Sequence, residues 1–413
     1  MNTHKLIGPF RQLVSMDHLP KKGPIRDEEL TIIQKGGLIV NNGIILEVGT
    51  FESLYKRCTK NNISVDYQET DLVVLPGLID AHTHMCFAGS RAADFASRNN
   101  GKSYQEIARE GGGIWHTVGH TRKASQTQLA DLLLQRLDRQ LNMGITTMEV
   151  KSGYGLSVPE ELKMLNAIRS AGLKHQADVI PTCLAAHIIP KDFTGTEENY
   201  LNHLLEVLVP KIKKQKLSNR FDIFVEQGAF RPESALRFLN KLREREFDLT
   251  VHGDQFSTGG SKVAIAAKAV SVDHLEASGP AEIECLSKSD VIPVALPGAS
   301  IGLGCSFAPV RKLLDKGCSL AIASDWNPGS APQGNLIMQA SILSTYEKLS
   351  AAEVWAGLTF RAAKALKLPD RGILKKGYLA DIVAFPCTDF REILYHQGML
   401  KAKKVWKKGQ VAG

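Results

Sequence analysis

Cysteine is scarce in this 413-residue sequence, and its few copies are scattered. There are seven cysteines, an odd number, and no CxxC pair occurs among them. A disulfide framework is therefore not expected, and a reducing cytoplasm is the predicted location. Residues 1–19 lack the apolar core of a signal peptide, and no apolar run is long enough to span a membrane.

The sequence also lacks low-complexity tracts, short-period repeats and a phosphate-binding loop. The triple glycine at 111–113 has neither the strand–GxGxxG–helix context nor a following Lys-Ser/Thr. The formal net charge is +8, with an isoelectric point near 9.0, which suits an anionic small substrate. Two basic runs, 211–216 and 401–408, are interpreted as solvated faces, because no nucleic-acid-binding motif accompanies them. Neither nucleic acid nor membrane is an expected partner.

Hydrophobic residues make up 43% of the chain, enough for a barrel of about 250 residues plus a smaller unit. Eight short apolar runs in the middle of the chain alternate with helical stretches such as 127–142 and 159–171. This alternation predicts an α/β fold, a parallel (β/α)8 TIM-like barrel, over residues 75–367. The predicted strands are 78–84, 146–150, 179–183, 221–225, 249–252, 270–274, 291–296 and 320–324.

Both ends of the chain have a different, β-rich character. Apolar runs at 38–40 and 44–46 flank an Asn-Asn-Gly turn, which predicts a hairpin. Further short strands are expected at 72–75, 382–385 and 405–406. Residues 1–74 and 368–413 are therefore predicted to form one small β-sandwich domain.

The strongest local signal for chemistry is the His-Thr-His sequence at His82 and His84. Residues two apart on a strand point the same way, so both imidazoles can face the barrel mouth. Two imidazoles form half of a metal site. Alone, the pair favours the alternative, two polar residues at the end of a strand, slightly more than a metal site.

Four other candidates end or follow predicted barrel strands, where the chemistry of such barrels gathers: His187, His252, His274 and Asp325. Three imidazoles and a carboxylate suit Zn²⁺ or an iron ion, which lowers the pKa of a bound water to about 7. Asp325 can also accept a proton from that water. His274 is better placed as a general acid or base than as a ligand, the alternative being a structural histidine.

Arg91 and Tyr154 lie on loops that follow predicted strands. An arginine there is suited to bidentate binding of a carboxylate, with a surface salt bridge as the alternative. Tyr154 lies between two glycines, where the alternative is a packed aromatic side chain. Lys151 follows the same strand as Tyr154. A carbamylated lysine bridging two metals is a minor alternative to an ordinary charged residue there.

These residues resemble the amidohydrolase superfamily. PGLIDAHTH (76–84), a later strand-end histidine, another histidine and a final Ser-Asp are its pattern. The resemblance narrows to the imidazolonepropionase family through EVKSGYGL (149–156) and SDWNPGS (324–330). GSR (89–91), AAH (185–187) and HGDQ (252–255) agree with it, so the resemblance covers most of the chain.

The resemblance implies one Zn²⁺ or Fe³⁺ per chain and hydrolytic ring opening of 4-imidazolone-5-propanoate to N-formimidoyl-L-glutamate by a metal-bound hydroxide. Family members are often dimers, so a homodimer is also implied. Ten residues receive roles: His82, His84, His252 and Asp325 as metal ligands, and Arg91, Tyr154, His187, Asn327, Gly329 and Ser330 as substrate contacts.

One position departs from related deaminases, which place a proton-shuttling glutamate three residues after the strand-end histidine. Here that residue is Gln255, preceded by Asp254. An amide is no general acid or base at neutral pH, so Gln255 is assigned to substrate binding. Proton transfer then falls to Asp325 and His274, with Asp254 a weaker candidate. The alternatives are a hydrolase of another ring, such as a purine or pyrimidine, and a non-catalytic binding protein.

Overall fold

The computed structural model describes residues 4–60, 63–68, 71–102 and 104–412. Its larger part is a barrel of eight parallel strands: β6 (Leu78–Asp80), β7 (Ile145–Lys151), β8 (Asp178–Ala186), β9 (Arg220–Val225), β10 (Asp248–Gly253), β11 (Ser271–His274), β12 (Ile292–Ala295) and β13 (Ala321–Ile322). Neighbouring strands follow one another in chain order, as expected when each returns through a helical crossover.

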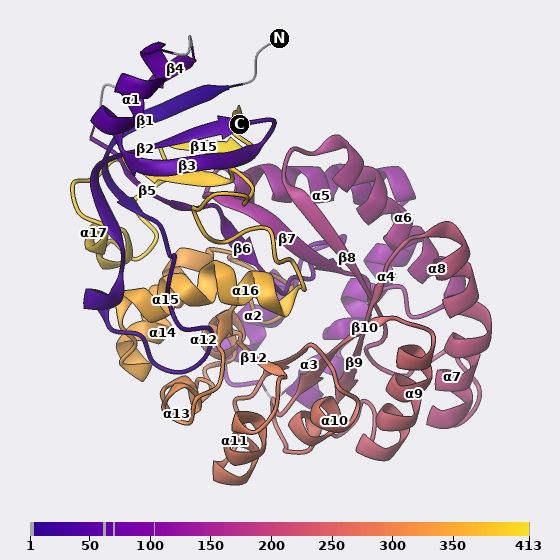
Figure 1. Cartoon of the computed structure of the whole chain (residues 1–413). Coiled ribbons are helices and arrows are strands. Elements are labelled where there is room, and N and C mark those ends of the chain that lie inside the picture. The colour runs from indigo at the N-terminus through magenta and orange to yellow at the C-terminus, as the bar shows by residue number, and fades with distance from the viewer. Residues whose placement is uncertain (1–3, 61–62, 69–70, 103, 413) are drawn as a thin grey trace.

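Helices surround the barrel strands in Figure 1. They are α2 (Ala92–Asn99), α3 (Tyr104–Arg109), α4 (Ile114–Lys123), α5 (Gln126–Leu141), α6 (Val158–Lys174), α7 (Glu197–His203), α8 (Val209–Gln215), α9 (Pro232–Glu244), α10 (Gly260–Ala266), α11 (Pro280–Ser287), α12 (Pro297–Leu303), α13 (Val310–Asp315), α14 (Leu336–Glu347), α15 (Ala351–Leu358) and α16 (Phe360–Ala365). All eight predicted strands and both predicted helical stretches are confirmed.

The first and last barrel strands are shorter than predicted. β6 ends at Asp80 rather than at residue 84, because the Asp80 carboxylate, not a strand backbone, accepts the Ser324 N–H at 2.9 Å. Beyond it, the backbone N–H of Asp325 donates to the His82 carbonyl (3.1 Å), and that of His84 to the Trp326 carbonyl (3.0 Å). These bonds close the barrel and bring the His-Thr-His segment beside Asp325.

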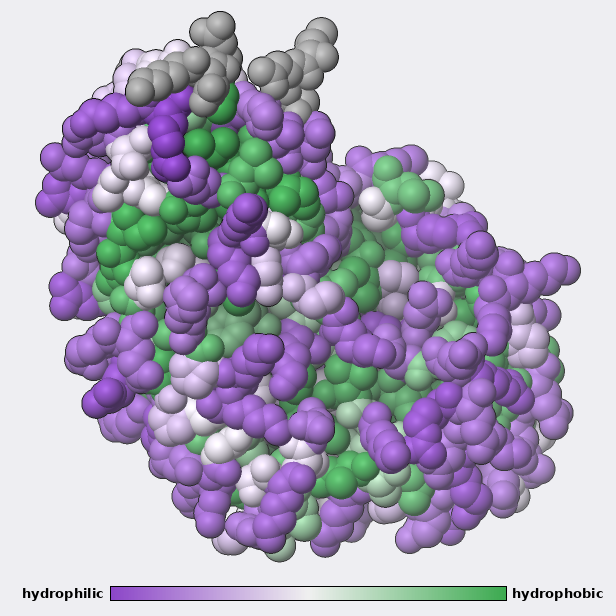
Figure 2. Space-filling model, in the orientation of Figure 1, coloured by the Kyte–Doolittle hydropathy of each residue, from purple (hydrophilic) through white to green (hydrophobic). Residues whose placement is uncertain are grey.

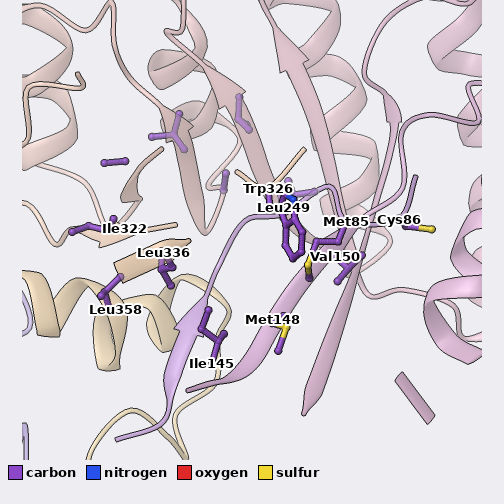
Figure 3. Packing of buried hydrophobic residues seen from close by; sticks show 14 of the residues in the cluster. Met85, Cys86, Ile145, Met148, Val150, Leu249, Ile322, Trp326, Leu336 and Leu358 are labelled. Atoms are coloured by element: carbon purple, nitrogen blue, oxygen red, sulfur yellow. The ribbon is translucent and has the colours of Figure 1, made fainter. Parts of the chain in front are cut away.

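The barrel interior is polar at the level of β7. Along this strand, Glu149 and Lys151 point inward, while Met148 and Val150 belong to the large apolar core, as the two-residue period of a strand requires. Figure 3 shows Met148, Val150 and Trp326 within this core. The apolar packing outside the strands therefore fixes which residues face the barrel axis.

The second part of the molecule is a mixed sheet built from both ends of the chain. Its strands are β1 (Lys5–Val14), β2 (Ile32–Asn41), β3 (Ile44–Thr50), β4 (Ser64–Tyr67), β5 (Val73–Pro76), β14 (Ile382–Phe385), β15 (Lys404–Lys407) and β16 (Gln410–Ala412). The predicted hairpin is β2–β3, and a β-rich unit built from both termini is confirmed, in the form of one mixed sheet. Its strands join into one sheet because β1 pairs with β2, with β4 and with β5.

This small sheet lies beside the barrel, and both ends of the chain reach it (Figure 1). Helix α1 (Phe51–Lys60) packs on it, whereas α17 (Arg391–Tyr395) packs against α14. The core of the sheet includes Phe10 and Trp406, whose rings meet edge to face. On the face in Figure 2, hydrophilic residues predominate and the largest apolar area covers this sheet. Among the described residues, no helix has the length and apolarity needed to cross a bilayer.

Candidate active site

Four predicted metal ligands converge at the carboxyl end of the barrel. The Nε2 atom of His84 lies 3.2 Å from Nε2 of both His82 and His252. Asp325 Oδ1 lies 3.5 Å from His82 Nε2 and 3.4 Å from His84 Nε2. Ligands bound to one zinc at about 2.0–2.1 Å in a tetrahedron are about 3.3 Å apart. The three histidines form a compact donor group, and Asp325 Oδ1 lies at ligand spacing from two of them, so the four side chains fit one metal ion.

The imidazoles are held in the form that a metal requires. Burial lowers the pKa of His82 and His84 well below the ordinary value and that of His252 to about 3. Neutral imidazoles coordinate metals, so the donor set fits a metal cofactor. The other ring nitrogens of His82 and His252 face carboxylates: His82 Nδ1 lies 2.6 Å from Asp273 Oδ2 and His252 Nδ1 lies 2.8 Å from Asp222 Oδ2.

A cavity of about 430 Å³ opens over these ligands. Its walls include nearly all the residues to which the sequence assigned a role, with His82 buried beneath it. The predicted residues in the wall are His84, Arg91, Tyr154, His187, His252, Gln255, His274, Asp325, Asn327, Gly329 and Ser330. A larger hollow of about 760 Å³, at the amino ends of β10 to β12, contains none of them.

His187 and Tyr154 form one side of the cavity. The Nδ1–H of His187 donates to the carbonyl of Gly153 at 3.0 Å, and burial lowers the pKa of the ring, so the ring is held neutral with Nε2 as a hydrogen-bond acceptor. Its ring stacks on that of His84, with centroids 5.6 Å apart. Tyr154 is buried, which raises the pKa of its phenol and keeps it a hydrogen-bond donor.

The loop after β13 is organised by Asn327. Its amide Nδ2 donates to Asp325 Oδ2 at 2.9 Å, so that Oδ1 remains on the side of the imidazoles. Its Oδ1 accepts the backbone N–H groups of Gly329 (2.7 Å) and Ser330 (2.8 Å). Asn327 therefore orients Asp325, a candidate metal ligand, and shapes the cavity wall at the same time.

His274 lies beside the ligand cluster with a carboxylate behind it. Its Nδ1 is 3.4 Å from Glu276 Oε1. Burial alone would lower the pKa of His274, but the Glu276 carboxylate raises it above the ordinary value. Both His274 (φ 87°) and Asp325 (φ 52°) have positive φ, a strained backbone conformation that is concentrated at functional sites.

Arg91 and Arg98 give the cavity a cationic end. Arg91 Nε donates to Asp94 Oδ2 at 2.7 Å, which fixes the guanidinium. Arg98 also lines the cavity, and its buried Nη2 has no hydrogen-bond partner among the described residues. Burial and the charge of Arg91 lower the pKa of Arg98. Sequence reasoning missed Arg98, although it lies seven residues after Arg91, two helical turns along the same face.

A side chain at position 329 is expected to displace the guanidinium of Arg91, because Gly329 lies against it. An added Cβ would lie 2.4 Å from Arg91 Nη1 and 3.1 Å from its Cζ. Overpacking of this kind costs about 1–3 kcal/mol, so Gly329→Ala should lower kcat/KM by about 5- to 150-fold, mainly through KM. Steady-state kinetics test this. Gly119→Ala, with nothing within 4 Å of its added Cβ, is the control. An unchanged KM in Gly329→Ala would show that Arg91 does not bind the substrate.

Asp254 is not placed for proton transfer. It is fully buried, its Oδ1 accepts the N–H groups of Gly259 (2.9 Å) and Ser261 (3.2 Å), and its Oδ2 accepts the Ser278 hydroxyl (2.8 Å). These bonds hold the loop after β10, and Asp254 does not line the cavity, whereas its neighbour Gln255 does.

Comparisons with known proteins agree with this architecture. The model of the "Amidohydrolase family" matches residues 99–412. The imidazolonepropionase of Bdellovibrio bacteriovorus is 37% identical over 389 residues, covering 94% of this chain and 90% of that protein. The imidazolonepropionase of Bacillus mycoides is 36% identical over 407 residues, covering 97% and 95%.

Solved structures with the same fold are more distant in sequence. The atrazine chlorohydrolase TrzN of Arthrobacter aurescens, complexed with zinc, has a TM-score of 0.69 at 17% identity, covering 98% of this chain and 94% of that one. Guanine deaminase of C. acetobutylicum, with bound guanine in the active site, has a TM-score of 0.67 at 17% identity, covering 99% and 100%. The extensive identity to the curated relatives places this chain in the amidohydrolase family and, within it, among the imidazolonepropionases.

Proposed function

We propose that this chain hydrolyses the ring of 4-imidazolone-5-propanoate to N-formimidoyl-L-glutamate, using one Zn²⁺ or Fe³⁺ per chain. The observation that carries the proposal is a single cavity with a three-imidazole, one-carboxylate donor set and the cations Arg91 and Arg98. Such a cavity suits a small ring that carries an anionic tail. The relatives named imidazolonepropionase support this substrate.

The proposed ligands are His82, His84, His252 and Asp325. When bound there, the metal supplies an acidified water and a positive charge near the developing oxyanion. Arg91 binds the propionate, while Tyr154, His187 and Gln255 contact the ring. Asn327, Gly329 and Ser330 complete the wall. These contacts hold the ring carbonyl carbon near the attacking water, which converts a bimolecular encounter into an oriented reaction.

Two chain groups are assigned to proton movement. Burial raises the pKa of Asp325, which makes its carboxylate a better acceptor for a proton of the attacking water. His274, whose pKa Glu276 raises, is assigned to protonating the ring nitrogen as the C–N bond breaks. One water is consumed, a C–O bond forms at the carbonyl carbon and a C–N bond breaks.

The glutamine at position 255 favours ring opening over deamination. In that position an amide can hydrogen-bond the ring but cannot shuttle protons at neutral pH. The test is turnover of 4-imidazolone-5-propanoate by metal-replete protein, followed by loss of the substrate's ultraviolet absorbance, with ammonia measured in parallel. Ring opening releases no ammonia, so ammonia release from a purine or pyrimidine instead would favour the alternative.

We further propose the cytoplasm as the site of action. All seven cysteines are free thiols, and five are buried, which suits a reducing compartment.

Replacing Glu276 by Gln should change the pH dependence of kcat. The carboxylate stabilises the imidazolium of His274, so the neutral amide should lower the pKa of His274. As a general acid, His274 is active when protonated and loses activity as the pH rises through its pKa. The alkaline limb of the pH–kcat profile should therefore move to lower pH. If the alkaline limb did not move, His274 would not be the general acid.

A further inference from the structure

Lys151 is a buried cation that the proposed chemistry does not use. It is 1% exposed and lies inside the barrel at the end of β7. Its Nζ lies 2.8 Å from Glu149 Oε1, 2.8 Å from Asp222 Oδ2 and 3.9 Å from Asp273 Oδ2. A carbamate here would face three carboxylates. The charges around it therefore require the ammonium form and exclude a carbamylated lysine.

Two of these carboxylates are the ones behind the metal-ligand histidines. Asp273 Oδ2 lies 2.6 Å from His82 Nδ1, and Asp222 Oδ2 lies 2.8 Å from His252 Nδ1. Neighbours fix both carboxylates further: Ser271 Oγ donates to Asp273 Oδ1 (2.9 Å), and the backbone N–H of His252 donates to Asp222 Oδ1 (3.2 Å). Lys151 thus links Asp273, which lies behind His82, to Asp222, which lies behind His252.

We propose that Lys151 is a positioning residue of the metal centre. Its ammonium holds Asp222 and Asp273 together, and these keep the Nδ1 atoms of His252 and His82 turned away and both Nε2 atoms turned toward the metal. The inference rests on the metal ligands of the proposed function. It assigns to a residue outside the cavity wall a role in metal affinity.

The physical reason is that three buried carboxylates without a cation repel one another and leave their acceptor positions. Groups behind metal-binding histidines fix the tautomer and ring orientation, and their loss typically costs 10- to 100-fold in metal affinity or activity. Charge alone predicts the opposite, because a nearby ammonium repels a metal cation and its removal should tighten binding. Weaker Zn²⁺ binding after removal of the ammonium therefore indicates a positioning role, and tighter binding indicates charge repulsion alone.

The experiment is a Zn²⁺ affinity measurement on metal-stripped full-length protein, by competition with a fluorescent chelator. Lys151→Met should bind Zn²⁺ about 10- to 100-fold more weakly than the wild type. Lys151→Gln, which still donates to one carboxylate, should fall between them and serves if the Met variant does not fold. Circular dichroism of the metal-free proteins checks the fold.

Lys407→Met is the matched control. Lys407 is also a buried lysine between two aspartates, with its Nζ 2.8 Å from Asp178 and 2.5 Å from Asp381, but it belongs to the small sheet. The Lys407→Met variant should be less stable than the wild type and should bind Zn²⁺ with the same affinity. Unchanged or tighter binding in folded Lys151 variants, or equal weakening in Lys407→Met, overturns the inference. A wild-type protein that binds no metal tightly would instead overturn the proposed function.

Discussion

Replacement of Asp325 by Asn is expected to lower kcat by about 10³- to 10⁴-fold. General-base catalysis alone contributes about 10²- to 10⁴-fold, and the substitution also exchanges the anionic side chain of a proposed metal ligand for a neutral one. Because Asn327 Nδ2 donates to Asp325 Oδ2 at 2.9 Å, the new amide either places its NH₂ group against the NH₂ group of Asn327 or turns it toward the Nε2 atoms of His82 and His84. Both arrangements disturb the site. Kinetics on the metal-loaded variant, with its metal content measured, test this.

The matched control for this variant is Asp381→Asn. Asp381 is 3% exposed, close to the 2% of Asp325, and it pairs with Lys407 away from the cavity. Its loss should reduce thermal stability and leave kcat near the wild-type value. If metal-loaded Asp325→Asn kept more than a tenth of wild-type kcat, Asp325 would not be the proton acceptor.

The barrel was predictable because each strand carries its own signal. The eight apolar runs are short, and the polar residues that follow them lie at one rim in a parallel barrel. The junction between the first and last barrel strands, β6 and β13, was not predictable. Regular pairing stops at Asp80 because a side chain substitutes for the strand backbone there, and no local pattern in the sequence encodes that exchange.

The residues in the cavity wall were predictable where they lie at the end of a barrel strand or in a family motif. Arg98 lies in no such motif, and its role depends on how the helix after Arg91 is oriented. The unit of Lys151, Asp222 and Asp273 was equally hidden, because it joins three strands that lie far apart in the sequence. Inward-facing charged residues on barrel strands have partners that only the tertiary fold identifies.

Replacement of Arg91 by Met is the most direct test of substrate identity. Truncating one partner of a buried charge pair costs about 2–5 kcal/mol, so kcat/KM for 4-imidazolone-5-propanoate should fall by about 30- to 5000-fold, chiefly through KM. The Arg91 side chain is 12% exposed and is held by Asp94. Water therefore cannot readily replace the paired N–H donors of the guanidinium in the variant. Arg98 supplies a second positive charge but not the same geometry.

Specificity separates this effect from general damage. A substrate analogue with a propionamide in place of the propionate should have a much lower kcat/KM than the acid in the wild type. In Arg91→Met, the kcat/KM values for acid and amide should be nearly the same. Arg91→Lys keeps the charge but cannot bind Asp94 and the carboxylate through one planar fork, so it should fall between the two. Equal acid-to-amide ratios of kcat/KM in the wild type and Arg91→Met would show that Arg91 does not bind the propionate. The anionic tail would then have to be bound at the other guanidinium, Arg98, whose Nη2 has no protein partner in the described part of the chain.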